Sequence, residues 1–305
     1  MAISVYPQVS SITQQSSYQN IPPPESSTSA ENNTTNNWAG YVATNGSYSG
    51  VSGSWTVPSV TGSGDTSADA TWIGIGGITS NDLIQVGTQN IVAPNNQVTT
   101  SAFYELLPGA SQSISTVTVH PGDSITASIT EISGGEWKII FNDNTDGSSY
   151  TDTVSYTSSE SSAEWIEEDP SDGSAEVPLD SFGTVSFTNG STIQNGTTVN
   201  LSGSNAYAVT MVNAEDQVLA TASSLGSTGA SFTVTRGSAS TGSSLTQFSG
   251  NPGSWRRHGS GIGKEWQWTN PTTTVAPASS VTTVDSSNGW WPGFIPRSFS
   301  GFHFF

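Results

Sequence analysis

Short apolar runs recur along the middle of this chain and are separated by turns rich in Gly, Ser and Asn. Side chains on a strand alternate between two faces, so short runs with a period of two predict β-strands. Many short strands at near-regular spacing, without helical periods, predict an all-β fold, an antiparallel β-sandwich. The candidate strands are Gly50–Val57, Ala70–Ile75, Leu83–Thr88, Thr99–Leu107, Ser124–Ile132, Glu136–Asn142, Thr151–Tyr156, Ala163–Glu168, Gly183–Thr188, Tyr207–Val212 and Ser231–Thr235.

Changes in composition divide the chain into three regions. Residues 1–35 hold Gln, Ser, Asn and a Pro22-Pro23-Pro24 run, which indicate a disordered leader or a propeptide remnant. Residues 36–237 carry the strand pattern, with order beginning near Asn37. Residues 238–305 lack clear alternation but hold four of the six basic residues and five of the ten tryptophans. We interpret this tail as a low-order extension or a reading-frame artefact; the alternative is a segment that contacts a membrane or cell wall.

The charge balance narrows the possible partners. The chain has 24 acidic and 6 basic residues and a formal net charge of -18. Phosphate binding needs Lys and Arg, so a nucleic-acid partner is excluded. Protonation of the carboxylates in acid would relieve their mutual repulsion, which favours a protein that works at acid pH.

Other absences narrow the chemistry and the location. There is no cysteine, which excludes disulfides, zinc-thiolate sites and a cysteine nucleophile. No stretch is long and apolar enough to span a membrane. The first residues lack the basic and apolar segments of a signal peptide, yet the body is typical of an extracellular protein. We therefore expect an extracellular or secreted monomer without cofactors.

The densest run of carboxylates is Ala163–Asp169, which includes Glu164, Glu167 and Glu168. Carboxylates this close repel one another in any fold, so the run is a candidate for chemistry. A solvated acidic edge is the alternative. A second acidic stretch, residues 142–147, lies between two candidate strands, and we interpret it as a hairpin loop. It lacks the EF-hand spacing and terminal glutamate of a calcium site, and we expect no metal.

Alternation also predicts which side chains share a face on three neighbouring candidate strands. If Ile and Val face the core, the opposite face presents Trp72, Gln85, Phe103 and Glu105. Its floor is thinned by Gly74, Gly76 and Gly87, and glycine inside a strand often marks the close approach of a ligand backbone. Such a groove would hold an extended polymer. The alternative is an ordinary solvent-exposed face whose glycines form bulges.

Eight blocks of the sequence, in order, resemble the glutamic peptidases, or eqolisins. The blocks are Asn37–Gly40, Ser54–Pro58, Thr71–Ile75, Leu83–Gly87, Tyr104–Pro108, Pro121–Ile125, Ala163–Asp169 and Phe182–Phe187. The resemblance implies a concanavalin-like or lectin-like jelly roll of two bent antiparallel sheets. It also implies a catalytic dyad, which falls on Gln85 and Glu168. Protein or peptide substrates would bind in extended conformation, and we assign Trp72, Phe103 and Glu105 to their binding.

The chain departs from the family pattern at several positions. It has no cysteine, whereas fungal members carry cysteines, so it resembles a bacterial or archaeal branch. Gly76 replaces an acidic residue, and Ser101 and Leu107 replace polar or aromatic groups of the family cleft. These changes leave the dyad intact but alter the expected subsite preferences.

The implied mechanism is acid endopeptidase chemistry. Glu168 would act as general base and then general acid, while the Gln85 amide would stabilise the oxyanion. Glu105 would hold the water or Gln85. One expectation conflicts with this role: alternation puts Glu168 on the face of Ile166, which by itself would point into the core. A bulge in the acidic run, or a groove that includes Ile166, would reconcile the two.

Two other functions fit the same sandwich. A lectin-like glycan-binding or cell-surface module would use the aromatic face for stacking. A glycosidase would use a carboxylate pair such as Glu105 and Glu168, about 5–5.5 Å apart in a retaining enzyme or about 6.5–9.5 Å apart in an inverting one.

Overall fold

Each candidate strand overlaps a strand of the computed structural model, which describes residues 33–62, 64–171, 177–239, 254–258 and 265–269. The strands are β1 (Thr34–Thr35), β2 (Trp38–Ala43), β3 (Tyr48–Thr56), β4 (Ser67–Gly76), β5 (Leu83–Val92), β6 (Val98–Leu106), β7 (Gln112–Ser113), β8 (Ser124–Ser133), β9 (Glu136–Asp143), β10 (Ser149–Ser155), β11 (Ala163–Glu168), β12 (Thr184–Gln194), β13 (Thr197–Asn200), β14 (Tyr207–Val212), β15 (Val218–Ala222), β16 (Phe232–Arg236), β17 (Ser254–His258) and β18 (Glu265–Thr269). The fold is all-β, as predicted.

Strand β2 was not among the candidates. It reads Trp-Ala-Gly-Tyr-Val-Ala and is buried along its whole length. A strand that is buried on both faces shows no polar alternation, and Gly40 interrupts its β-propensity. The sequence signal that predicts the other strands is therefore missing here.

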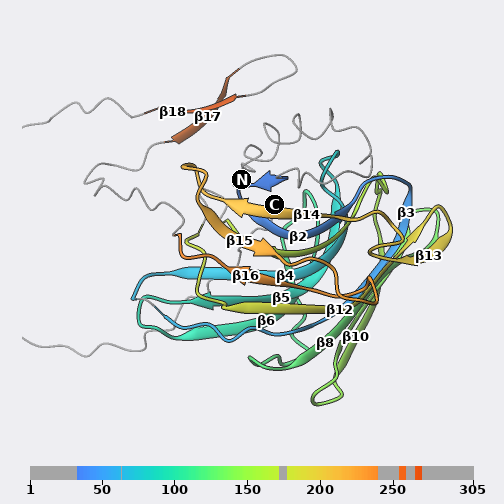
Figure 1. The fold of residues 1–305 in the computed structure, drawn as a ribbon, viewed down its shortest axis with the longest axis horizontal. Helices are drawn as coiled ribbons and strands as arrows, with labels where there is room; N and C mark the ends of the chain where they lie inside the picture. The colour runs from blue at the N-terminus through green and yellow to red at the C-terminus, as the bar shows by residue number, and fades with distance from the viewer. Residues whose placement is uncertain (1–32, 63, 172–176, 240–253, 259–264, 270–305) are drawn as a thin grey trace, which may run out of the picture. The chain divides into compact units, whose positions relative to one another are not determined.

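The strands follow one hydrogen-bonded path that forms two sheets (Figure 1). Sheet A runs in the order β10-β9-β8-β3-β12-β16-β15-β14, with β13 beside β12. Sheet B runs in the order β14-β2-β11-β4-β5-β6-β7, so β14 belongs to both. All pairs on this path are antiparallel; the short β1 pairs with β14 in parallel. The predicted hairpin at residues 142–147 connects the paired strands β9 and β10.

The main hydrophobic core lies between the two sheets. Sheet A contributes buried rings, including Trp55 and Phe187, and sheet B contributes alternate residues such as Ile73, Val86 and Trp165. The Trp165 indole N–H donates to the carbonyl oxygen of Ser52 in sheet A, over 2.8 Å. This buried donor is therefore satisfied without water.

A second apolar cluster covers the opposite face of sheet B, which we call the outer face. Its buried members are Trp38, Val42, Ala70, Trp72, Ile78, Leu83, Phe103, Ile166 and Val209. As a result, every residue of β2, β4 and β11 is buried. These strands form the central part of sheet B, and side chains on both of their faces are removed from water.

The chain divides into two units, residues 1–244 with 302–305, and residues 245–301. In the second unit the structure describes the antiparallel pair β17–β18, in which Ser254 lies opposite Thr269. The remaining expectations for the leader and the tail fall almost entirely outside the described residues. Within the described residues, no helix is long and apolar enough to cross a membrane.

Candidate active site

The acidic run forms the central strand β11 of sheet B. Glu168 pairs with Trp38 of β2 on one side and with Ala70 of β4 on the other, and neither register shifts along β11. Strict alternation therefore places Glu164, Ile166 and Glu168 on the outer face, while Trp165 and Glu167 face the core.

Ile166 belongs to the outer-face cluster with Trp38 and Trp72. It does not point into the core between the sheets, so the conflict raised by the sequence disappears. Of the two explanations, the one in which Ile166 shares the outer face with Glu168 is correct, because β11 contains no bulge.

The carboxylate of Glu168 accepts hydrogen bonds from three N–H donors. Asn37 Nδ2 and Trp38 Nε1 donate to Oε1 over 3.2 and 3.0 Å, and Trp72 Nε1 donates to Oε2 over 2.7 Å. The side chain has no exposed surface. Charge-assisted bonds from N–H groups stabilise the ionised carboxylate and so oppose the cost of burying it.

Two indoles orient this carboxylate. The rings of Trp38 and Trp72 pack edge to face, with centroids 5.0 Å apart and an interplanar angle of 79°. Both donors are therefore held by ring packing as well as by their bonds to Glu168. Trp72 is one of the residues predicted to bind substrate, whereas no role was predicted for Asn37 or Trp38. Both lie in the Asn37–Gly40 block, but nothing in its pattern shows that these donors face an acid on another strand.

The glycines of sheet B make room for these indoles. A Cβ on Gly87 would lie 2.5 Å from Cβ of Trp72, and one on Gly74 would lie 2.8 Å from the Trp72 ring. On Gly77 it would lie 3.2 Å from the Trp38 ring. Gly76 has φ +94° and lies against the Asp82 backbone. The floor for a ligand backbone stays a prediction. In the structure the Trp72 ring lies over Gly74, and the Thr71 carbonyl oxygen and the Trp72 Cβ lie against Gly87.

Gln85 lies on the same outer face, on β5. It is opposite Gly74 of β4 and Glu105 of β6. Its Nε2 donates to Glu105 Oε2 over 2.9 Å, whereas its Oε1 is buried without a hydrogen-bond partner. Neither side chain has exposed surface. Of the two roles considered for Glu105, the structure shows the contact with Gln85.

The structure brings all five sequence-predicted residues to one face of sheet B. Phe103 is fully buried beside Trp72 in the outer-face cluster. Gln85 and Glu168 lie on either side of β4, whose Trp72 extends from Glu168 to the space above Gly74, next to Gln85. Two strand spacings of about 4.8 Å separate β11 from β5 by roughly 10 Å. The β4 residues opposite Glu168 and Gln85, Ala70 and Gly74, also lie four positions apart along the strand.

The neighbouring acids of β11 differ from Glu168 in their surroundings. Burial raises the pKa of Glu164 well above its ordinary value, and the Ser162 hydroxyl offsets only part of this effect. Burial likewise raises the pKa of Glu167, and the nearby Asp69 raises it further. Both groups therefore favour the neutral acid, in contrast to the carboxylate held by three N–H donors.

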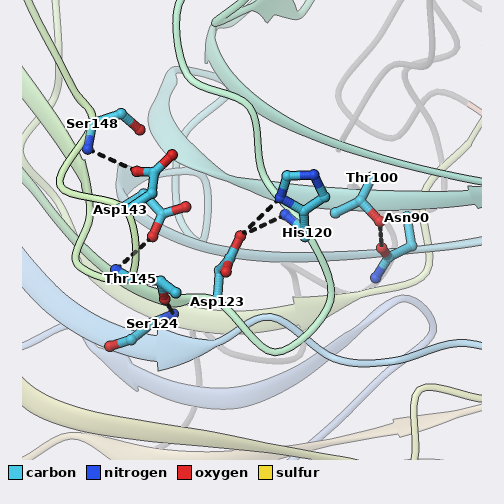
Figure 2. Close-up of polar contacts among 9 residues, drawn as sticks. Asn90, Thr100, His120, Asp123, Ser124, Asp143, Thr145 and Ser148 are labelled. Atoms are coloured by element: carbon cyan, nitrogen blue, oxygen red, sulfur yellow. Dashed lines mark hydrogen bonds and ion pairs between the residues drawn. The ribbon is translucent and has the colours of Figure 1, made fainter.

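The loop at residues 142–147 uses its acids to cap its own turns (Figure 2). Asp143 Oδ1 accepts from the backbone N–H of Thr145 over 2.8 Å, and Asp146 Oδ1 accepts from that of Ser148 over 2.8 Å. Nearby, Asp123 Oδ2 accepts from the backbone N–H of His120 over 2.7 Å. Among the described residues, no group of three or more His, Cys, Asp or Glu side chains is arranged to hold a metal ion.

A model of the peptidase A4 family matches residues 36–236. The chain belongs to the peptidase A4 family. It is accordingly a glutamic peptidase, an enzyme that hydrolyses peptide bonds.

Individual relatives agree with this assignment. The chain is 30% identical over 188 residues to aspergillopepsin-2 of Aspergillus niger, covering 54% of this chain and 67% of the relative. It is 33% identical over 178 residues to scytalidopepsin B of Scytalidium lignicola, covering 54% and 66%. Scytalido-glutamic peptidase, solved with a transition-state-analogue inhibitor, superposes with a TM-score of 0.58 at 27% identity. That comparison covers 66% of this chain and 98% of the solved chain.

The close packing of Gly87 against Trp72 generates a prediction. We expect Gly87→Ala to force β5 away from β4 and to lower the free energy of unfolding by about 1–3 kcal/mol, because the added methyl would lie 2.3 Å from the Thr71 carbonyl oxygen and 2.5 Å from Cβ of Trp72. Urea denaturation in acid would measure the change. The control is Gly134→Ala, whose added methyl meets nothing within 4 Å and should change stability by less than about 0.5 kcal/mol. Equal stability of the two variants would contradict the role given to Gly87.

Proposed function

We propose that this glutamic peptidase is an acid-acting endopeptidase, with Glu168 as general base and general acid and Gln85 as oxyanion stabiliser. The observation that carries the proposal is the carboxylate of Glu168, held by three N–H donors on the face that also carries Gln85. The family supplies the reaction class, peptide hydrolysis.

Glu168 suits a base that operates in acid. Its three N–H donors favour the ionised form, so the group keeps its capacity to accept a proton where an isolated buried carboxyl would be neutral. It takes a proton from a water molecule, which attacks the scissile carbonyl carbon. The protonated Glu168 then donates this proton to the leaving amine nitrogen.

Gln85 supports the developing oxyanion. Its Nε2 carries two hydrogens, of which one is directed to Glu105 and the other remains for the substrate oxygen. An amide keeps these hydrogens at every working pH, so the donor is not lost when the carboxylates titrate. Glu105 is a positioning residue that fixes the rotation of the Gln85 amide.

An extended peptide is the proposed substrate. Related enzymes have been solved with a peptide-based transition-state analogue and with the tripeptide Ala-Ile-His. In the described conformation Gln85 and Glu168 have no exposed surface, so the outer face of sheet B must open when a substrate binds. The acidic composition, with its net charge of -18, supports action in acid and an extracellular location for a monomeric enzyme.

The two rival functions find less support. The family that matches residues 36–236 is a peptidase family, which favours peptide hydrolysis over glycan binding. A glycosidase pair of Glu105 and Glu168 would have to span β4 and β5, and Glu105 is already bound to Gln85. Polysaccharide hydrolysis or glycan binding without proteolysis would reverse this preference.

Loss of either dyad residue should abolish most activity without unfolding the protein. We expect Gln85→Ala to lower kcat on acid-denatured protein about 10²–10³-fold, the effect of removing an oxyanion donor. Glu168→Gln should lower it by at least about 10²-fold, because the proton acceptor is lost. The assay is a pH series of peptide release, with thermal unfolding measured in parallel.

The control for these variants is Gln217→Ala, at an exposed position in the connection between β14 and β15. It should keep wild-type activity across the pH series. Full activity in Gln85→Ala, or wild-type kcat in Glu168→Gln at any pH, would refute the assignment.

The contact between Glu105 and Gln85 gives a separate prediction. Glu105→Ala removes the acceptor that orients the Gln85 amide, and misplacement of a catalytic group costs up to about 10²-fold in rate. We expect the loss in kcat with KM nearly unchanged. Glu105→Gln, which keeps an acceptor oxygen, should restore part of the rate. A Glu105→Ala variant that raises KM alone would instead show that Glu105 binds substrate.

A further inference from the structure

The core-facing side of β11 carries a second set of acids that the proposed mechanism does not use. The side chain of Glu167 points to the opposite face of β11 from that of Glu168, and it is fully buried between the sheets. Thr71 Oγ1 of β4 donates to Glu167 Oε2 over 2.6 Å. Asp69 lies two residues before Thr71 on the same face of β4, and its carboxyl raises the pKa of Glu167 further above the effect of burial.

A third acid reaches this place from a different part of the chain. The segment at residues 177–180 runs parallel to the start of β4. Ala68 N donates to Pro178 O over 3.0 Å, and Asp180 N donates to Ala68 O over 3.1 Å. The Asp180 side chain is buried, and the neighbouring Asp69 carboxyl raises its pKa. We call Asp69, Glu167 and Asp180 the interior carboxyl cluster.

The buried oxygens of this cluster lack donors. Both carboxyl oxygens of Asp69, both of Asp180 and Oε1 of Glu167 are buried and have no hydrogen-bond partner among the described residues. An ionised carboxylate can only accept, so two carboxyls bond to each other only when one of them is protonated. If ionised, the cluster would hold like charges without compensation in the core.

Few neighbouring groups offset this cost. Asn90 faces Asp69 across the β4–β5 pair and lowers its pKa, but burial has the larger, opposite effect. The oxygen of the Asn90 amide already accepts from Thr100 (Figure 2). Around Glu167, the carboxyls of Asp69 and Asp180 both raise its pKa further.

Asp180 has a cation nearby that does not neutralise it. The Arg236 guanidinium of β16 donates to four backbone carbonyl oxygens at 3.0 Å or less, those of Asp180, Leu219, Gly237 and Ala239. It lowers the pKa of Asp180, yet burial and the adjacent Asp69 still raise that pKa to about 10, with a further contribution from Asp169.

We propose that the interior carboxyl cluster is a proton-dependent clamp that fastens the segment at residues 177–180 to strands β4 and β11 in acid and releases it as the pH rises. Protonated carboxyls share hydrogen bonds across three separate parts of the chain. Loss of the protons replaces those bonds with buried like charges, directly beneath the strand that carries Glu168.

The direction of the pH effect follows from linkage. Unfolded Asp and Glu lose their protons near about pH 4, whereas the folded cluster keeps them to higher pH. The folded state therefore binds more protons above that pH, and the unfolding constant rises up to tenfold per pH unit for each such group. The stability due to the clamp is complete below about pH 4 and is lost as the pH increases.

The test compares two triple variants with the same change in charge. In Asp69→Asn/Glu167→Gln/Asp180→Asn, uncharged amides replace the cluster. In Asp65→Asn/Glu215→Gln/Asp216→Asn, three exposed acids are replaced. Urea midpoints, followed by tryptophan fluorescence between about pH 3 and about pH 8, give the slope of the unfolding constant against pH.

We expect the wild type and the surface variant to lose stability steeply above about pH 4. In the cluster variant the unfolding constant should change less steeply with pH. Each acid replaced should remove up to a tenfold change in the unfolding constant per pH unit. A slope as steep as that of the wild type, or equal flattening in the surface variant, would overturn the proposal. Because the readout is unfolding, the result does not depend on the proposed catalytic roles.

Two further measurements keep the test decisive if the triple cluster variant does not fold. The single variant Asp180→Asn leaves the Asp69–Glu167 pair in place and should remove about one proton's share of the slope. In the wild type at about pH 6, the folded chain should bind more protons than the urea-unfolded chain. Equal proton binding by the two states would overturn the clamp.

Discussion

Strand β11 is buried on both faces, and this constraint governs the chemistry of the molecule. Consecutive residues of a strand point to opposite sides, so Glu167 and Glu168 enter two different interiors. Each carboxyl must be stabilised without bulk water. On the outer face, three N–H donors stabilise the ionised form of Glu168. On the core face, burial beside other carboxyls favours the protonated form of Glu167.

The stabilisation of the Glu168 carboxylate on the outer face depends on two tryptophans and on glycines that have no side chain beneath the rings. Trp38 and Trp72 supply N–H donors from rings that pack against each other. Gly74 and Gly77 leave the volume that these rings occupy. Ring packing fixes the donors more firmly than flexible polar side chains would, which is the preorganisation that the proposed base Glu168 requires.

The surroundings of the two faces support the proposed activity in acid. The donors around Glu168 favour the ionised form of the proposed base where free carboxyls begin to protonate. The proposed clamp needs the protons of the interior carboxyl cluster, and the net charge of -18 adds repulsion that acid relieves. The proposed catalysis and the proposed clamp therefore favour the same range of pH, through separate groups on opposite sides of one strand.

The sequence by itself determined the all-β class, most of the strands, and the sharing of one face by Trp72, Gln85, Phe103 and Glu105. Period-two alternation and turn composition are local properties, and the quoted blocks identified the family. Only the tertiary structure decided that Ile166 faces outward, that the glycines accommodate indoles, and that Asp180 joins Asp69 and Glu167. Alternation determines which side chains of one strand share a face. The pairing of strands that are distant in sequence determines which residues pack against that face.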